Sequence, residues 1–188
     1  MDERNSAVDA FANDAARDDE LILVDGLDRQ IGVATKERAH RDGLLHRAFS
    51  VLLVRGEGET AEYLVSQRAP GKYHSAGLWA NSCCSHPRVG EELLDAAYRR
   101  TREELGCTAV DLHEIGAFCY RAVFPDGLCE YEFDHVIVGR MDGTPAPDPT
   151  EVSATRWVAR DALAAELAAH PERFAPWAFT VFSLALQA

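Results

Sequence analysis

The chain has 188 residues, is 47% hydrophobic and carries a formal net charge of −12 at pH 7. This length and apolar content suffice for one domain with its own core, so the five cysteines need not form a disulfide scaffold. The negative charge argues against binding to nucleic acid or to an anionic membrane. Because the sequence shows no recognisable signal peptide or long apolar run, we expect a cytoplasmic protein.

Residues 1–20 hold many acidic and few large apolar side chains, which predicts a mobile N-terminal arm before a single domain over residues 21–188. The domain begins with a hairpin of residues 21–24 and 31–33. A polar connection over residues 36–46 then leads to a second hairpin, formed by residues 49–54 and 63–67 around a turn rich in glycine.

A helix is predicted over residues 91–105, where apolar side chains recur every three to four residues and Gly106 provides the stop. Strands follow over residues 115–121 and 128–138, joined by a Pro-Asp-Gly turn. After a proline-rich connection over residues 141–149 come a strand over 152–158 and helices over 161–169 and 176–186. This mixture predicts an α+β fold with a mixed sheet covered by helices.

Basic side chains gather in one part of this acidic chain. Residues 36–102 hold 11 of the 19 Lys and Arg residues but only 8 of the 31 Asp and Glu residues, and both lysines, Lys36 and Lys72, lie there. Such a basic segment indicates a small anion as ligand, although chance together with an arginine-rich codon bias would give the same distribution.

Two acidic patterns are candidates for metal binding. Glu103 and Glu104 stand in the last turn of the predicted helix, where they oppose the negative end of the helix dipole unless a cation offsets them. Glu130 and Glu132 alternate along a predicted strand and therefore share one face, which suits a metal or acid and base work. The alternative in both cases is a pair of solvated surface acids.

The segment Asn81-Ser82-Cys83-Cys84-Ser85-His86-Pro87 packs two thiols and an imidazole into a predicted loop. If it is extended, Cys84 and His86 project to the same side, and a positive neighbour or helix N-terminus would favour the thiolate. A structural zinc site is the competing interpretation, but adjacent cysteines lack the usual gap between ligands.

Three histidines and two carboxylates offer ligands for a borderline divalent ion such as Zn²⁺ or Mn²⁺, provided that they converge. An all-oxygen site near Glu104 would suit Mg²⁺. The five residues of the first set are His40, His46, His86, Glu130 and Glu132.

Several motifs occur together in the order seen in type I isopentenyl-diphosphate isomerases, a branch of the Nudix fold, which the chain resembles over roughly residues 21–186. The cysteine-histidine-proline segment is the most specific of them. The motifs are Lys36-x3-His40, Leu45-His46, Gln67-Arg68-x3-Lys72, Gly77-Leu78-Trp79, the segment 81–87, Arg102-Glu103-Glu104-Leu105-Gly106, Glu130-Tyr131-Glu132 and Pro176-Trp177.

The Nudix signature, Gly-x5-Glu-x7-Arg-Glu-x2-Glu-Glu-x-Gly, is degenerate in this chain. Ser85 aligns with its first Gly, and Arg100 stands in place of its central Glu; Glu91, Arg99 and the Glu103–Gly106 segment match. Loss of the central Glu weakens the multi-metal site with which Nudix hydrolases cut diphosphates.

The resemblance implies an α/β/α sandwich and the reversible conversion of isopentenyl diphosphate to dimethylallyl diphosphate through a state resembling a tertiary carbocation. It implies that Cys84 and Glu132 are catalytic and that Tyr120 assists them. His40, His46, His86, Glu130 and Glu132 would hold one Mn²⁺ or Zn²⁺. Glu104 and the main-chain carbonyl of Cys84 would help to hold Mg²⁺ on the diphosphate.

It further implies an anion clamp for the diphosphate and aromatic faces for the carbon skeleton. The clamp residues are Lys36, Arg68, Lys72 and Arg100, and the aromatic candidates are Trp79, Tyr120 and Trp177. Phe182 stands where family members often carry a tryptophan, so either Phe182 substitutes for that ring or another ring covers the pocket.

Two other functions remain open at this point. The first is a Nudix diphosphohydrolase, which the helix with Glu103 and Glu104 supports and which Arg100 and Ser85 oppose. The second is a metal-binding or redox protein without catalytic activity that uses Cys83, Cys84 and the histidines. The expected partner is a small diphosphate; the sequence determines neither the oligomeric state nor the downstream pathway.

Overall fold

The computed structural model describes residues 18–72 and 74–187. Most of the predicted N-terminal arm therefore lies outside the described residues. Residues 18–20 belong to the folded domain, because the Asp18 carboxylate accepts a hydrogen bond from Arg88 at 2.7 Å and the backbone N–H of Lys36 donates to the carbonyl of Asp19 at 2.7 Å.

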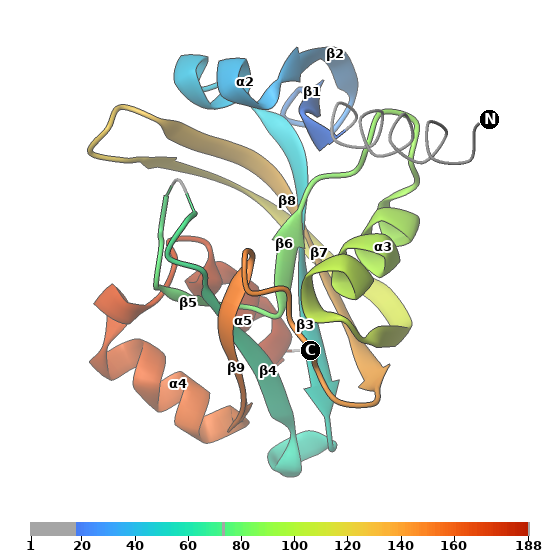
Figure 1. Ribbon diagram of the computed structural model, residues 1–188, viewed down its shortest axis with the longest axis vertical. Coiled ribbons are helices and arrows are strands. Elements are labelled where there is room, and N and C mark those ends of the chain that lie inside the picture. Colours follow the sequence, from blue (N-terminus) through green and yellow to red (C-terminus); the bar gives the residue numbers. More distant parts are fainter. Residues whose placement is uncertain (1–17, 73, 188) are drawn as a thin grey trace, which may run out of the picture.

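Strand β3 (His46–Arg55) is the centre of the sheet (Figure 1). It pairs in parallel with β8 (Cys129–Asp142) and antiparallel with β6 (Cys83–Ser85), and β8 continues the sheet to β7 (Thr108–Val123). The predicted first hairpin is confirmed as β1 (Glu20–Val24) and β2 (Gln30–Thr35). Strand β1 connects the hairpin to β3, where Leu23 pairs with His46.

The second predicted hairpin forms only next to its turn. Strand β4 (Glu62–Arg68) pairs with β3 at two positions and then turns away to pair with β9 (Val152–Ala159) along its length. A two-residue strand, β5 (Trp79–Ala80), adds to the other side of β4. The two strands diverge because β6 and β8 take the places beside β3, so the sheet splits into two parts joined at one corner.

Helices cover both faces of the sheet, which confirms the predicted α+β sandwich (Figure 1). Helix α3 (Leu93–Leu105) buries Ala96, Ala97 and Leu105 against Val51 and Leu53 of β3. Helices α4 (Arg160–Ala169) and α5 (Ala178–Gln187) pack on the opposite face. Successive β3 residues face opposite sides, so a single strand supplies both cores.

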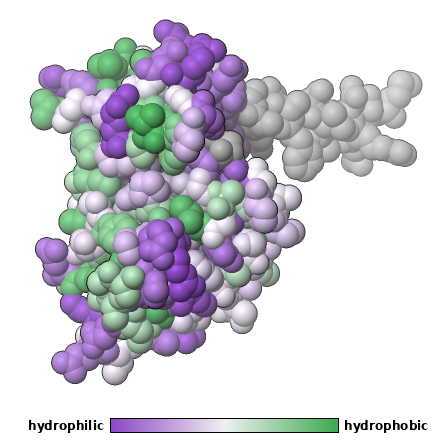
Figure 2. Space-filling model, turned by 90° about the vertical axis from the view of Figure 1, so that its left-hand side faces the viewer, coloured by the Kyte–Doolittle hydropathy of each residue, from purple (hydrophilic) through white to green (hydrophobic). Residues whose placement is uncertain are grey.

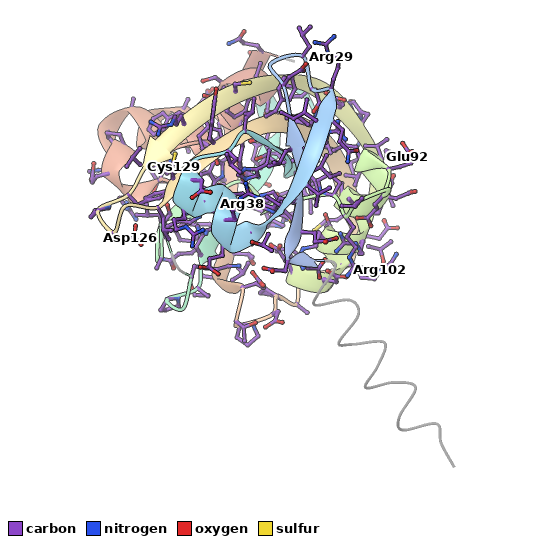
Figure 3. The ribbon with its side chains drawn as sticks, turned by 90° about the horizontal axis from the view of Figure 1, so that it is seen from above. Arg29, Arg38, Glu92, Arg102, Asp126 and Cys129 are labelled. Atoms are coloured by element: carbon purple, nitrogen blue, oxygen red, sulfur yellow. The ribbon has the colours of Figure 1, made fainter. Side chains whose placement is uncertain are left out.

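Helix α2 (Lys36–Asp42) occupies the segment predicted as a polar connection. Its start is fixed by the Thr35 side chain, which accepts a hydrogen bond from the N–H of Arg38 at 3.3 Å, and its end by Gly43 in the left-handed conformation. Two one-turn 3₁₀ helices, η1 (Gly58–Thr60) and η2 (Pro171–Arg173), complete the elements of the residues that the structure describes. Seen from above, Arg38 marks α2 and Arg29 the tip of the first hairpin (Figure 3).

Gly106 ends α3 as predicted, with a φ of 60°. A Cβ at this position would lie 2.4 Å from the carbonyl oxygen of Ala146, so both the backbone conformation and the space select glycine. The helix itself starts at Leu93, two residues after the predicted start.

Hydrophobic residues reach the surface in separate patches between hydrophilic ones on the face in Figure 2. Among the described residues, no helix is long and apolar enough to cross a membrane. All five cysteines are free thiols.

Ser82, which is buried, joins the two parts of the sheet. Its hydroxyl accepts a hydrogen bond from the N–H of Leu53 at 2.8 Å and donates to the carbonyl of Leu64 at 2.6 Å. Replacing Ser82 with alanine would leave both buried backbone groups unsatisfied, so we expect the free energy of unfolding to fall by about 1–3 kcal/mol. Denaturant unfolding measures this loss, and an unchanged midpoint would contradict the bridging role.

Candidate active site

Alternate residues of neighbouring strands build one polar wall of a pocket. Opposite pairs in the parallel ladder place His46 beside Glu132, and the antiparallel ladders place Cys84 beside Ser50 and Tyr120 beside Glu132. Because side chains alternate along a strand, these groups point to the same side of the sheet. The segment around Cys84, which the sequence placed in a loop, is extended and forms β6.

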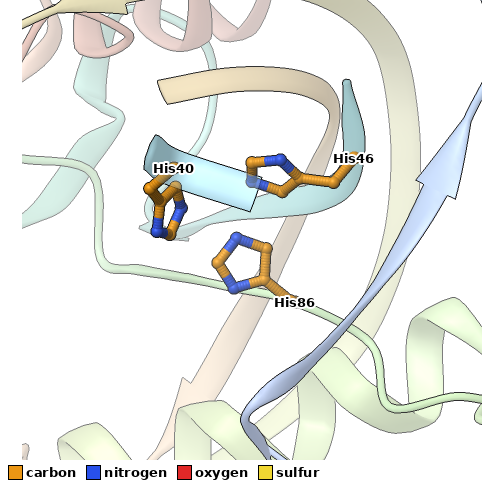
Figure 4. A group of neighbouring side chains, drawn as sticks. All are labelled: His40, His46 and His86. Atoms are coloured by element: carbon orange, nitrogen blue, oxygen red, sulfur yellow. The ribbon is translucent and has the colours of Figure 1, made fainter. Parts of the chain in front are cut away.

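Three imidazoles lie close together (Figure 4), and that of His86 lines the pocket. His40 comes from α2, His46 from the start of β3 and His86 from the residue after β6. The ring centroid of His46 lies 5.1 Å from that of His40 and 5.2 Å from that of His86. One ring nitrogen from each of the three lies within 4.8 Å of the others, a separation suited to one shared ion.

Two buried carboxylates complete this group. Oε2 of Glu130 lies 3.2 Å from Nε2 of His40, and Oε1 of Glu132 lies 3.0 Å from Nε2 of His86. Nε2 of His46 is 3.7 Å from an oxygen of each carboxylate, which is too far for a hydrogen bond. The five predicted ligands therefore converge.

The tautomer of His46 fits a metal site. Its Nδ1 lies 2.8 Å from the carbonyl oxygen of Leu44, which can only accept, so Nδ1 carries the proton. In the neutral imidazole, Nε2 then carries the lone pair and faces the carboxylates, in the arrangement typical of an imidazole that ligates a metal. Imidazole and carboxylate donors together suit Zn²⁺ or Mn²⁺, so these residues fit the implied ion.

Cys84 lies further along the same wall. Its Sγ is 3.1 Å from Oδ1 of Asn81, 3.1 Å from Nε1 of Trp177 and 3.5 Å from Oγ of Ser50. Burial raises the pKa of the thiol to about 12, and the nearby Asp134 carboxylate adds to the shift. The raised pKa favours the protonated thiol over the thiolate that a positive neighbour or helix N-terminus would favour, because the surroundings of Cys84 are buried and acidic.

Tyr120 and Glu132 form a hydrogen-bonded pair in the same pocket. The phenol donates a hydrogen bond of 2.5 Å to Oε2 of Glu132, and burial together with this carboxylate raises the pKa of Tyr120. Burial and Glu130 push the pKa of Glu132 upward, but the two neighbouring imidazoles, His86 at 3.0 Å and His46 at 3.7 Å, outweigh them and hold it below its usual value. Burial lowers the pKa of His86 to about 4.

The four predicted clamp residues all line the pocket, beside Glu104 and Glu151. Lys72 pairs with Glu151, and Arg100 pairs with Glu104 and, at 2.9 Å, with Glu103. Burial lowers the pKa of Lys36, and the charge of Lys72 contributes to the shift. The four cationic groups thus line one and the same pocket.

Trp79 and Phe182 do not line this pocket. The guanidinium of Arg156 lies 4.4 Å over the Trp79 ring, which packs with the α4 and α5 core, so the expected role of Trp79 in substrate binding needs correction. Phe182 is fully buried in the same core. The aromatic candidates Trp177 and Tyr120 do line the pocket, with ring centroids 6.1 Å apart.

The acids of the Nudix signature are mostly bound to arginines. Glu91 pairs with Arg99 at 2.7 Å, and Glu103 pairs with both Arg99 and Arg100. Only Glu104 of these acids lines the pocket. Cys83 packs in the α3 core, on the other side of β6 from Cys84, so the two cysteines do not act as paired ligands.

Sequence reasoning missed five polar residues of the site: Ser50, His74, Asn81, Asp134 and Glu151. Asp134 continues the alternation of Glu130 and Glu132, which was a usable signal, and its carboxylate accepts a hydrogen bond from Ser50 at 2.8 Å. Burial raises the pKa of Asp134, and Glu132 contributes. His74 and Glu151 stand alone in the sequence and carried no signal.

Residues 44–178 match the family model of the NUDIX domain. An isopentenyl-diphosphate Delta-isomerase from Serratia proteamaculans is 47% identical over 87% of this chain and 89% of its own length. An enzyme of the same name from Burkholderia multivorans is 49% identical, over 85% of this chain and 89% of its own length.

Solved structures agree on the fold. A Deinococcus radiodurans protein superposes with a TM-score of 0.68 at 23% identity, covering 86% of this chain and 96% of its own. A MutT NUDIX hydrolase from Burkholderia pseudomallei superposes with a TM-score of 0.60 at 18% identity, covering 74% of this chain and 97% of its own.

Proposed function

This chain belongs to the isopentenyl-diphosphate Delta-isomerase family, which has the NUDIX fold, and from that premise we propose that it interconverts isopentenyl diphosphate and dimethylallyl diphosphate. The observation that carries the proposal is one pocket lined by the Cys84 thiol, the Tyr120–Glu132 pair and a cluster of cations. The substrate is a small diphosphate, for which the cations are the complementary charges.

The reaction moves a double bond from the end of the carbon chain to its interior. One carbon gains a proton and another loses one, so the enzyme needs one group that gives a proton and one that takes a proton. We assign these roles to Cys84 and to Glu132 with its partner Tyr120. They project from β6 and β8, the strands on either side of β3, so both can reach one bound chain.

Protonation of an alkene leaves positive charge on a tertiary carbon, which water would capture. The indole of Trp177, itself 3% exposed, offers a π face that stabilises a cation, and the buried carboxylates of Glu130 and Glu132 add negative charge. Tyr120 contributes a second ring on the same side of the pocket.

Two ions take part in this proposal. His40, His46, His86, Glu130 and Glu132 would hold one Mn²⁺ or Zn²⁺, which when bound supplies positive charge that fixes and polarises Glu132. Glu104 and the main-chain carbonyl of Cys84 would contact a Mg²⁺ that accompanies the diphosphate. Because Arg100 pairs with Glu104 and lies at the same end of the pocket, it can contact the same diphosphate.

Lys72 is expected to act mainly in binding. Replacing it with alanine removes one charge-assisted contact to the diphosphate, worth about 1.5–3 kcal/mol, so KM should rise by roughly 10- to 100-fold while kcat changes little. Steady-state kinetics separate the two constants, with Lys72→Arg as a charge-preserving control. An unchanged KM removes Lys72 from the clamp.

A Nudix diphosphohydrolase is less well supported. Of the signature acids Glu91, Glu103 and Glu104, only Glu104 lines the pocket, and one signature acid is too few for the several metal ions that such hydrolysis uses. A reduced Cys84 is required for the isomerase chemistry, which agrees with a reducing compartment such as the cytoplasm.

Proton NMR of isopentenyl diphosphate in D₂O, with Mg²⁺ and a trace of Mn²⁺ or Zn²⁺, tests the proposed function. We expect loss of the terminal vinylidene signals, growth of dimethylallyl signals with deuterium incorporated, and unchanged phosphorus signals. Released phosphate with an intact carbon skeleton would instead establish the hydrolase.

A further inference from the structure

His74 links the metal-ligand cluster to the segment that carries Arg68 and Lys72. Its side chain is buried, and its Nε2 lies 2.6 Å from Oε1 of Glu130. The other oxygen of that carboxylate, Oε2, faces His40 at 3.2 Å and His46 at 3.7 Å. His74 therefore holds the oxygen of Glu130 that is turned away from the imidazole cluster.

The ring of His74 is itself held on two sides. It stacks on Phe124 in the β7–β8 turn, with centroids 4.5 Å apart and planes 18° apart, and it meets Trp177 edge-on at 5.9 Å. Because both neighbours are aromatic and the ring is buried, few other orientations of the imidazole fit this slot.

The backbone of His74 is tied to the anion clamp. Its carbonyl oxygen accepts a hydrogen bond from Nη2 of Arg68 at 3.2 Å, and Lys72 stands two residues earlier in the chain. One residue thus contacts a metal ligand through its side chain and a diphosphate-binding cation through its main chain.

We propose that His74 is a positioning residue that orients Glu130 for metal binding and thereby couples metal binding to the placement of the Arg68–Lys72 segment. Hydrogen bonds to a ligating carboxylate commonly control metal affinity, and coupling between two sites acts equally in both directions. Metal in the imidazole cluster then favours the arrangement of the clamp that binds diphosphate. The clamp half of this inference rests on the proposed function.

His74 is not itself placed as a ligand. The two groups of potential ligand atoms within 4.8 Å of one another, as found among the described residues, are formed by His40, His46, His86, Glu130 and Glu132. The contact of His74 with Glu130 lies behind that carboxylate, on the side of Phe124 and Trp177.

Zn²⁺ affinity, measured by competition with a chromophoric chelator, tests the contact with Glu130. The variant His74→Phe keeps a flat ring between Phe124 and Trp177 but loses the nitrogen, so we expect Zn²⁺ binding to weaken by about 10- to 100-fold. His74→Gln retains a donor and should recover part of this loss. The exposed His170→Phe serves as the matched control and should bind Zn²⁺ like the unmodified protein.

Trypsin cleavage after Lys72, followed by mass spectrometry, tests the coupling. Zn²⁺ should slow this cleavage several-fold in the unmodified protein and leave it unchanged in His74→Phe at Zn²⁺ concentrations that saturate both. The absorption bands of bound Co²⁺ should be the same in both proteins, because the ligand set is preserved.

Three outcomes would overturn the inference: Zn²⁺ affinity of His74→Phe within twofold of the unmodified protein, equal protection of Lys72 in both, or altered Co²⁺ bands, which would make His74 a ligand. None of these measurements uses isopentenyl diphosphate. A chain that binds Zn²⁺ as expected but leaves that compound unchanged in the NMR assay would therefore contradict the proposed reaction and not the role of His74.

Discussion

Replacing Cys84 with alanine, or Glu132 with glutamine, is expected to lower kcat for isomerisation by about 10²- to 10⁴-fold, the usual contribution of a group that transfers a proton. Cys84→Ala removes the thiol proton that burial holds in place, and the methyl group of alanine cannot replace it. Glu132→Gln keeps the size of the side chain but replaces the carboxylate, which accepts the hydrogen bond from Tyr120, with a neutral amide.

The folded structure should survive both changes, since neither removes a large part of a core. Thermal unfolding and the circular dichroism spectrum check this point. Cys119→Ala, an exposed thiol, and Glu62→Gln, a surface acid paired with Arg55, are the matched controls and should keep full activity. Retention of more than about a tenth of the rate by Cys84→Ala or Glu132→Gln contradicts the assigned roles.

Removal of the ion from the imidazole cluster is the second change with a large expected effect. After treatment with a chelator and return to buffer with Mg²⁺ alone, we expect activity to fall at least 100-fold and to recover when Mn²⁺ or Zn²⁺ is added. The physical reason is charge, because Glu130 and Glu132 are buried beside each other and repel without a cation between them.

The same treatment should lower thermal stability. An ion present at 100 times its Kd stabilises the folded state by about 2.7 kcal/mol, which corresponds to a fall in Tm of about 5–10 °C on removal. His40→Ala should reproduce both effects, whereas the exposed His170→Ala should not. Full activity in Mg²⁺ alone, together with metal analysis that finds no other ion, would contradict the site.

The sequence predicted those helices and turns that depend on residues close to one another in the chain. Gly106 ends α3 because its backbone conformation and the approach of Ala146 both require glycine, and the spacing of apolar residues predicted the helix before it. The site residues were indicated by the resemblance to a known family, in which the same short motifs occur in the same order. Helix α2 was missed although Thr35 and Gly43 mark its two ends, because its seven residues are too few to show a period.

The pairing of strands distant in the sequence could not be predicted in this way. No residue near His46 indicates that it lies beside Glu132, since this neighbour depends on the parallel pairing of β3 with β8. Trp79 shares a motif with Gly77 and Leu78, but β5 pairs with β4 and turns the ring to Arg156. His74 acquires its place only through contacts with Phe124, Glu130 and Trp177.

The parallel pairing of β3 with β8 also affects how fast the chain folds and unfolds. His46 and Glu132 meet only when two strands from distant parts of the chain have closed into one ladder, a step that is slow because the intervening loop loses much entropy. An ion that binds both side chains stabilises an arrangement completed late in folding. Metal should therefore lengthen the lifetime of the folded protein by slowing unfolding, and leave the rate of folding almost unchanged.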